Sequence, residues 1–123
     1  MGIPAEFPPL SDKGLLFNMH QIIFCTCPDR ETAEKIARHL VQSNHAACIN
    51  ILPTVTSVFQ WKNAIEMEQE LLLLIKTRAD HFAAVEEQIK SLHPYELPEI
   101  IAVSIDRGLP DYLKWIDSCL VTR

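Results

Sequence analysis

Glycine is scarce in this chain of 123 residues, which contains only three glycines. Loops that bind nucleotide phosphates need glycines in a short run, and the sequence has no P-loop and no G-x-G-x-x-G. The nucleophile motif G-x-S-x-G and the zinc-protease motif H-E-x-x-H are missing as well. These absences argue against a nucleotide-dependent enzyme and against the common hydrolases.

Clusters of lysine and arginine are also lacking, and the formal net charge is -5 with a pI of about 5.4. An acidic chain of this kind is a poor partner for nucleic acid, so we expect no nucleic-acid binding. The longest apolar run, Leu71 to Ile75, is far too short to span a membrane. We therefore expect no membrane insertion.

The start of the chain lacks the charged and then apolar pattern of a secretory signal, so we expect a cytoplasmic protein. The four cysteines do not indicate a disulfide framework, because a chain of this length can form a core without cross-links. Prolines and glycines interrupt residues 1–18, which show no periodicity and are predicted to form a flexible tail. Residues 19–123 are predicted to form a single domain.

Apolar periodicity in that domain predicts four strands and three helices. The expected strands are His20–Cys27, Ala46–Trp61, Ile65–Thr77 and Glu99–Asp106. The helices are expected after the N-cap residues Asp29 and Asp80, and from Pro110 onward. The apolar helix faces are expected to be Ala33, Ile36, Ala37, Leu40 and Val41, then Phe82, Val85, Ile89 and Leu92, and finally Tyr112, Trp115, Ile116, Cys119 and Leu120.

Three positions refine this pattern. Pro53 cannot donate to a sheet ladder, so the second strand should be an edge strand or a bulged one. Asn44 and Asn63 tolerate a positive φ, which suits a helix end and a tight hairpin turn. The order β-α-β-β-α-β with a terminal helix is the ferredoxin-like α+β arrangement, with an antiparallel sheet, a long hairpin and two helices on one face.

Both faces of the predicted sheet are apolar. Leu71, Leu73 and Ile75 point to one face, while Leu72 and Leu74 point to the other. Two helices cover only one face, and the short last helix cannot cover the second. We therefore expect another copy of the chain to cover it.

Several separate motifs resemble one known family. The segments CTCPD, HAACINILPTVTSVFQW, ELLLLIKT and HPYELPEIIAV, followed by YLKW, resemble the CutA divalent-cation-tolerance proteins over about Met19 to Leu120. The resemblance implies a ferredoxin-like fold, a homotrimer and metal binding, with a link to bacterial copper tolerance. This chain has Asn63 where the family usually has glycine, and asparagine can adopt the same backbone conformation.

The resemblance also places Cys25 at the family position associated with metal. His93 and Glu99 stand at the two ends of HPYELPE, which two prolines hold extended. The first and fourth strands are neighbours in this fold, so Cys25, His93 and Glu99 should come within reach of one another. Ligation by sulfur, nitrogen and oxygen suits Cu²⁺, with Zn²⁺ and Cu⁺ as alternatives.

Each candidate also has a purely structural interpretation. A buried free Cys25 behaves as a small hydrophobic residue, and Cys27 with it forms only a weak C-x-C motif. Cys48 and Cys119 are interpreted as core residues, and the other four histidines as surface residues. Glu66, Glu68 and Glu70 share one strand face that we expect to be solvated.

Together these patterns predict a trimeric, non-enzymatic copper-binding protein that acts in divalent cation tolerance or homeostasis. The alternative is a signalling or adaptor protein similar to the PII proteins, which would bind a small molecule or a protein partner in clefts between subunits. A thiol-dependent enzyme based on Cys25 and His93 is a third and weaker alternative, because no oxyanion hole is recognisable.

Overall fold

The computed structural model describes residues 19–120 and shows an α+β fold, as predicted. Its elements are β1 (His20–Cys27), α3 (Arg30–Gln42), β2 (Cys48–Trp61), β3 (Ala64–Arg78), the 3₁₀ turn η1 (Ala79–His81), α4 (Phe82–Leu92), β4 (Ile101–Ser104) and α5 (Pro110–Cys119). The predicted tail at residues 1–18 lies outside the described residues. Within residues 19–120, no helix is both long enough and apolar enough to cross a membrane.

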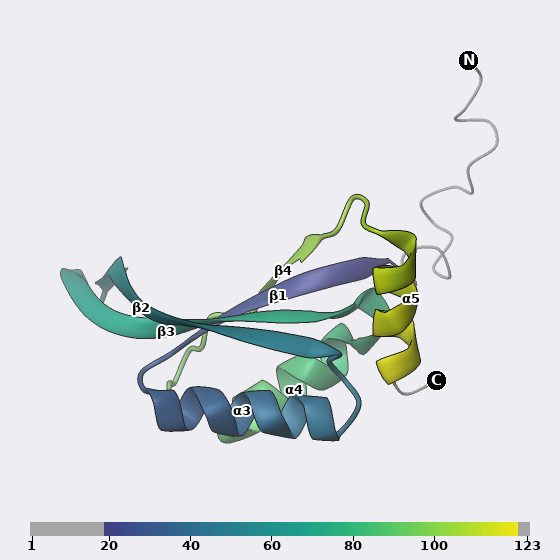
Figure 1. Cartoon of the computed structure of the whole chain (residues 1–123). Coiled ribbons are helices and arrows are strands. Elements are labelled where there is room, and N and C mark those ends of the chain that lie inside the picture. Colours follow the sequence, from purple (N-terminus) through teal and green to yellow (C-terminus); the bar gives the residue numbers. More distant parts are fainter. Residues whose placement is uncertain (1–18, 121–123) are drawn as a thin grey trace, which may run out of the picture.

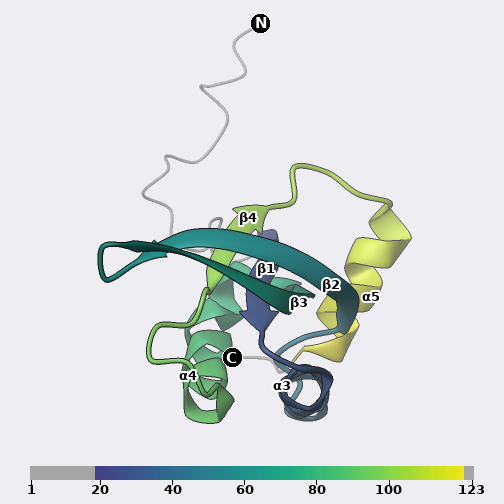
Figure 2. The ribbon, with the colours of Figure 1, turned by 90° about the vertical axis from the view of Figure 1, so that its left-hand side faces the viewer.

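The four strands form one antiparallel sheet in the order β2-β3-β1-β4. Helices α3 and α4 lie side by side under one face of this sheet (Figure 1). Helix α5 stands at one end of the sheet instead of covering its other face (Figure 2). The order of the elements and the neighbouring positions of β1 and β4 confirm the sequence prediction.

The main core lies between the sheet and these two helices. Ile23, Leu73 and Ile75 from the strands are fully buried against Leu40 of α3 and Ile89 of α4. Their alternation along β1 and β3 explains the placement, because every second strand residue points toward the helices. This core includes both Cys25 and Cys27.

The predicted helix boundaries of α3 are confirmed. The side chain of Asp29 accepts a hydrogen bond from Thr32 N at 2.8 Å and so caps the helix. Asn44 has a φ of 64°, the left-handed conformation expected just after a helix. The sequence prediction that Val41 lies on the buried face of α3 was wrong, because the residue is 41% exposed.

The hairpin of β2 and β3 carries the features that the sequence indicated. β2 is an edge strand, and its register with β3 shifts between Leu52 and Val55, around Pro53. Thr54 takes up the extra residue with a φ of 48°. At the tip, Lys62 and Asn63 have φ values of 51° and 69°, as a tight two-residue hairpin turn requires.

Two expectations about side chains of η1 were wrong. Asp80 does not cap α4, because its carboxylate binds Arg78 through two hydrogen bonds of 3.0 and 2.8 Å. His81 is not a surface histidine, because it is fully buried and its Nδ1 lies 2.9 Å from Nδ1 of His45.

The predicted apolar face of α5 is buried only in part. Tyr112 and Trp115 are 40% and 44% exposed, while Ile116 is fully buried.

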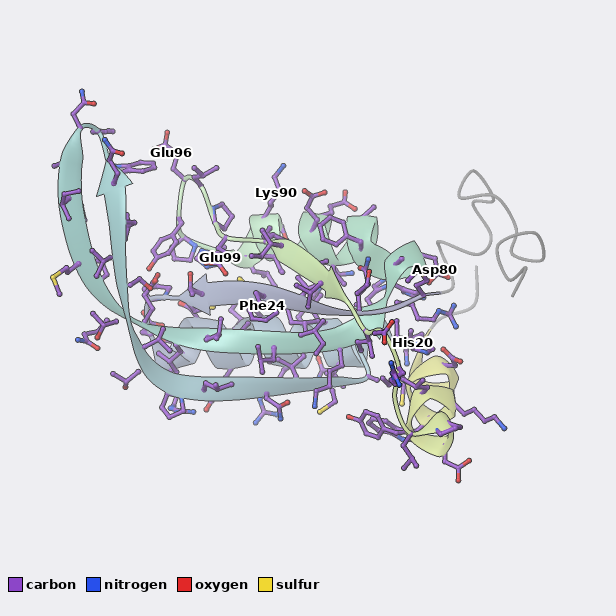
Figure 3. The ribbon with its side chains drawn as sticks, turned by 90° about the horizontal axis from the view of Figure 1, so that it is seen from above. His20, Phe24, Asp80, Lys90, Glu96 and Glu99 are labelled. Carbon is purple, nitrogen blue, oxygen red and sulfur yellow. The ribbon has the colours of Figure 1, made fainter. Side chains whose placement is uncertain are left out.

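Strand β4 is also shorter than predicted, because its ladder with β1 runs only from Ile101 to Ser104. The face of the sheet opposite α3 and α4 is apolar, as expected. Phe24 projects from it (Figure 3), and Leu74 pairs with Phe24 across the strands. Ile101 and Val103 on the same face are 55% and 47% exposed.

Candidate metal centre

Two thiols and one imidazole meet at the end of β1. One ligand atom from each of Cys25, Cys27 and His93 lies within 4.8 Å of the other two, and all three residues are buried. The two cysteines belong to one strand and are two residues apart, so both side chains point to the same face of the sheet. The structure thus brings the predicted residues Cys25 and His93 together and adds Cys27 as a third member of this dithiol–imidazole cluster.

His93 is positioned by the end of α4, where Pro94 prevents another turn of helix. Its Nε2 lies 2.7 Å from the carbonyl oxygen of Thr26, and its Nδ1 accepts a hydrogen bond from Tyr95 N at 3.2 Å. The Tyr95 ring also packs against the imidazole, with 4.6 Å between ring centroids. The imidazole is therefore held by β1 on one side and, on the other, by Tyr95 of the proline-bracketed segment, residues 94–98.

The two thiols share a hydrogen bond that shifts their pKa values in opposite directions. A hydrogen bond from Cys25, helped by His93 and opposed by burial, lowers the pKa of Cys27 to about 6. The same hydrogen bond, burial and the nearby negative charges raise the pKa of Cys25. Burial lowers the pKa of His93, but hydrogen bonds with Cys27 and Thr26 outweigh it and raise the pKa overall. The surroundings of Cys27 thus favour its ionised form.

Glu99 lies outside the dithiol–imidazole cluster. Glu99 is an exposed residue beside the start of β4 (Figure 3). Its charge nevertheless raises the pKa of Cys25, so the carboxylate is near enough to act on the thiol electrostatically. Burial and the charge of Glu70 raise the pKa of Glu99 itself.

The sequence interpretation missed a contact between β3 and the proline-bracketed segment. Glu70 was expected on a solvated face, but only 6% of it is exposed, and its Oε2 accepts a hydrogen bond of 2.6 Å from the Tyr95 hydroxyl. Burial and this contact raise the pKa of Tyr95. The tyrosine in HPYELPE was the available signal, since a phenol that becomes buried needs a partner.

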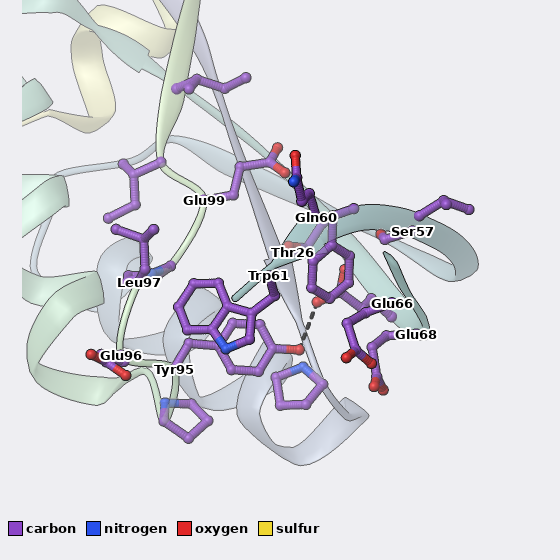
Figure 4. A pocket seen from close by; sticks show the side chains of 18 residues that line it. Thr26, Ser57, Gln60, Trp61, Glu66, Glu68, Tyr95, Glu96, Leu97 and Glu99 are labelled. Atoms are coloured by element: carbon purple, nitrogen blue, oxygen red, sulfur yellow. Dashed lines mark hydrogen bonds between the residues drawn. The ribbon is translucent and has the colours of Figure 1, made fainter. Parts of the chain in front are cut away.

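A pocket of about 1260 Å³ opens beside this contact, between the far half of the hairpin and residues 94–101. Trp61 and Tyr95 both line it (Figure 4). Five glutamates line the pocket, namely Glu66, Glu68, Glu70, Glu96 and Glu99, and its lining includes no lysine or arginine. A phosphate-bearing ligand would meet strong repulsion there.

The donor set of the cluster fits a soft transition-metal ion. Thiolate and imidazole are the usual ligands of zinc and of Cu⁺, whereas Mg²⁺ and Ca²⁺ require oxygen ligands. One ligand atom of each residue lies within 4.8 Å of the other two, which is close enough for a single ion to contact all three. Cys25, Cys27 and His93 would hold the ion.

Comparisons with known proteins identify the family. A family model described as "CutA1 divalent ion tolerance protein" matches residues 21–119. "Protein CutA" of Mus musculus is 40% identical over 113 residues, which cover 92% of this chain and 64% of the mouse protein. The chain thus spans less than two thirds of that relative.

Solved structures are similar as well. CutA from Xylella fastidiosa is 47% identical with a TM-score of 0.82, and the match covers 85% of this chain and 100% of that chain. The protein from Archaeoglobus fulgidus, described as a periplasmic divalent cation tolerance protein CutA, is 42% identical with a TM-score of 0.80, and the match covers 82% and 98%.

Proposed function

The chain belongs to the CutA1 divalent ion tolerance protein family, and from that membership we propose that it binds copper in divalent cation tolerance or homeostasis. The observation that carries the proposal is the dithiol–imidazole cluster of Cys25, Cys27 and His93. Two thiolates with one imidazole suit Cu⁺ and Zn²⁺, and Cu²⁺ bound to thiolates is redox-active. The site is proposed for Cu²⁺ or Cu⁺, with Zn²⁺ as an alternative.

The assembly that we propose is a homotrimer of ferredoxin-like subunits. The sheet order and the two helices on one face support the ferredoxin-like description. The half-covered apolar face with Ile101 and Val103 supports association with further copies. The edge strand β2 and the long hairpin offer additional surface for such contacts.

We propose a binding protein without a catalytic step. Each ring nitrogen of His93 has a backbone partner, Nε2 with Thr26 O and Nδ1 with Tyr95 N, so the imidazole beside Cys27 is not free to accept the proton of the thiol. A nucleophilic cysteine would need a free base within hydrogen-bond reach. The proposed compartment is the reducing cytoplasm, where Cys25 and Cys27 remain thiols. Because the Archaeoglobus fulgidus relative is described as periplasmic, cell fractionation is the direct test of this point.

A titration of the fully reduced chain with Zn²⁺ and with Cu⁺ tests the metal site. Cys25→Ser, Cys27→Ser and His93→Ala should each weaken binding by about tenfold or more, on the scale known for changes around metal ligands. Cys48→Ser is the matched control, because Cys48 is a half-buried cysteine on β2 outside the cluster. Equal binding by the three variants and the parent would place the metal elsewhere.

Glu99 is examined in the same titration. We predicted it as a ligand from the sequence, and its charge acts on Cys25. Glu99→Gln removes the charge and keeps the shape. A loss of about tenfold would make the carboxylate a ligand, whereas a smaller change fits a purely electrostatic influence.

The alternative function, a PII-like adaptor, has one observation in its favour, which is the pocket beside Tyr95. Its five glutamates oppose nucleotide phosphates, so the pocket favours a cationic group or a protein partner over a nucleotide. Titration with a polyamine such as spermidine in place of metal separates the two functions. Micromolar binding of this cation that is independent of Cys25 would support the adaptor.

A further inference from the structure

Both polar positions of the His93 ring are committed. Thr26 offers a carbonyl oxygen, which can only accept, so Nε2 at 2.7 Å must carry the ring hydrogen. Tyr95 offers a backbone N–H, which can only donate, so Nδ1 at 3.2 Å must present its lone pair. The protonation of this neutral imidazole is thus fixed by its two partners, and no lone pair is left over.

Ligation by His93 therefore always has the same consequence. If Nδ1 becomes the ligand, its only lone pair is used and Tyr95 N loses its acceptor. If Nε2 becomes the ligand, the ring hydrogen must move to Nδ1, which again can no longer accept from Tyr95. On either route the Tyr95 amide is released.

Tyr95 is also fixed at its other end. Its hydroxyl donates to Glu70, a residue that is only 6% exposed, at 2.6 Å. Its side chain lines the pocket together with Trp61 (Figure 4). Pro94 precedes it and Pro98 follows, so this short segment is too stiff for the amide to turn away without the side chain following.

We infer that Tyr95 couples occupancy of the dithiol–imidazole cluster to the shape of the surface pocket. The inference rests on the proposed function and adds a regulatory consequence to it. Release of the Tyr95 amide removes the contact that ties residues 94–98 to His93. The hydrogen bond from Tyr95 to Glu70 then resists movement of these residues. Coupling of this kind is reciprocal, so whatever holds Tyr95 in its present position weakens ligation by His93.

The first experiment measures amide hydrogen exchange in the full chain with and without Zn²⁺. The Tyr95 amide should exchange about fivefold faster or more when Zn²⁺ is bound, the lower end of usual coupling strengths. The Ala47 amide is the internal control, because it donates to Lys76 O at 3.0 Å, away from the cluster. Its exchange should not change.

The second experiment compares the chain's two tyrosines. Tyr95→Phe removes the contact with Glu70 and should raise Zn²⁺ affinity about fivefold or more, since the segment then moves at less cost. Tyr112→Phe on α5, where the ring is 40% exposed, should leave the affinity unchanged.

The outcomes distinguish failure of the coupling from failure of the proposed function. If Cys25→Ser and His93→Ala lose Zn²⁺ while the Tyr95 amide exchanges at the same rate with and without Zn²⁺, the coupling is refuted and the proposed function stands. An unchanged affinity in a folded Tyr95→Phe variant refutes the coupling as well. If Zn²⁺ binding survives both ligand substitutions, the proposed function and the coupling fail together.

Discussion

The carboxylate of Asp80 depends on one neighbouring side chain, Arg78. Asp80 is held by the two hydrogen bonds from Arg78, which lower its pKa below the ordinary value. Arg78 also reaches Asp117 on α5 at 3.1 Å, so the pair lies where the sheet meets that helix. The charge of Asp80 should therefore matter for stability.

Replacing Asp80 by asparagine should lower the free energy of unfolding at pH 7 by about 1 kcal/mol. The pKa of Asp80 is depressed in the folded chain, so its contribution is present above the unfolded value of 3.8 and is lost as the pH falls below it. Urea unfolding of parent and Asp80→Asn at pH 7 and pH 2.5 measures the difference. An equal difference at both values would contradict this account.

The sequence could identify some site residues and not others. Cys25 and His93 were identifiable because family motifs contain them. Cys27 was undervalued, although the spacing of two in a strand already placed it beside Cys25. The contact of Glu70 with Tyr95 joins residues 25 positions apart through tertiary packing, and no local pattern distinguishes Glu70 from Glu66 and Glu68.

At the scale of elements, the bulge in β2 is the most unusual feature. Thr54 adopts a φ of 48°, where a β-branched side chain is strained by roughly 1–2 kcal/mol. Pro53 before it cannot join the ladder, which explains why the register shifts at this point. The strain is local and the residue is exposed, so it can be relieved by substitution.

Thr54→Asn should stabilise the chain by about 0.5–1 kcal/mol and raise the melting temperature by a few degrees, because asparagine tolerates this conformation. Thr56→Asn is the control, since Thr56 is also exposed but pairs regularly with Gln69. That control should be neutral or slightly destabilising. A lower melting temperature for Thr54→Asn would show that Thr54 makes a necessary contact.

Elements were predictable where local rules acted alone. The bounds of β1 and the Asp29 cap follow from periodicity and from one side-chain hydrogen bond. Asp80 misled the prediction because Arg78 competes for its carboxylate, which sequence spacing does not reveal. The last residue of β4, Ser104, pairs with Gln21 near the start of β1, so the ladder stops there and the apolar run alone overestimated the length of β4.

For the whole molecule, assembly is the property most open to test. Leu74→Asp places a charge on the apolar face opposite α3 and α4 and should prevent trimer formation, since burying an unpaired charge costs several kcal/mol. Val41→Asp is the control, because Val41 is a similarly apolar residue exposed on α3. Sedimentation measures both. A stable, folded monomer of the unmodified chain would end the trimer proposal.

The proposed division into a tail and one domain has its own test. Deleting residues 1–18 should change the melting temperature by no more than a few degrees, because prolines and glycines interrupt this segment without periodicity. Thermal unfolding of the shortened and full chains at equal concentration measures the change. A large drop would show that the segment packs on the domain.

The position of β1 in the middle of the sheet has a consequence for synthesis. Its residues leave the ribosome before those of the other strands, yet Ile23 pairs with Ile75 of β3 and with Ala102 of β4, which are made much later. At about 5–20 residues per second, the interval before both partners exist is several seconds. During that time the apolar stretch HQIIFCTC has no native ladder and can pair with the same stretch of another nascent chain. Translation speed between residues 28 and 104 should therefore influence how much of the product is recovered folded.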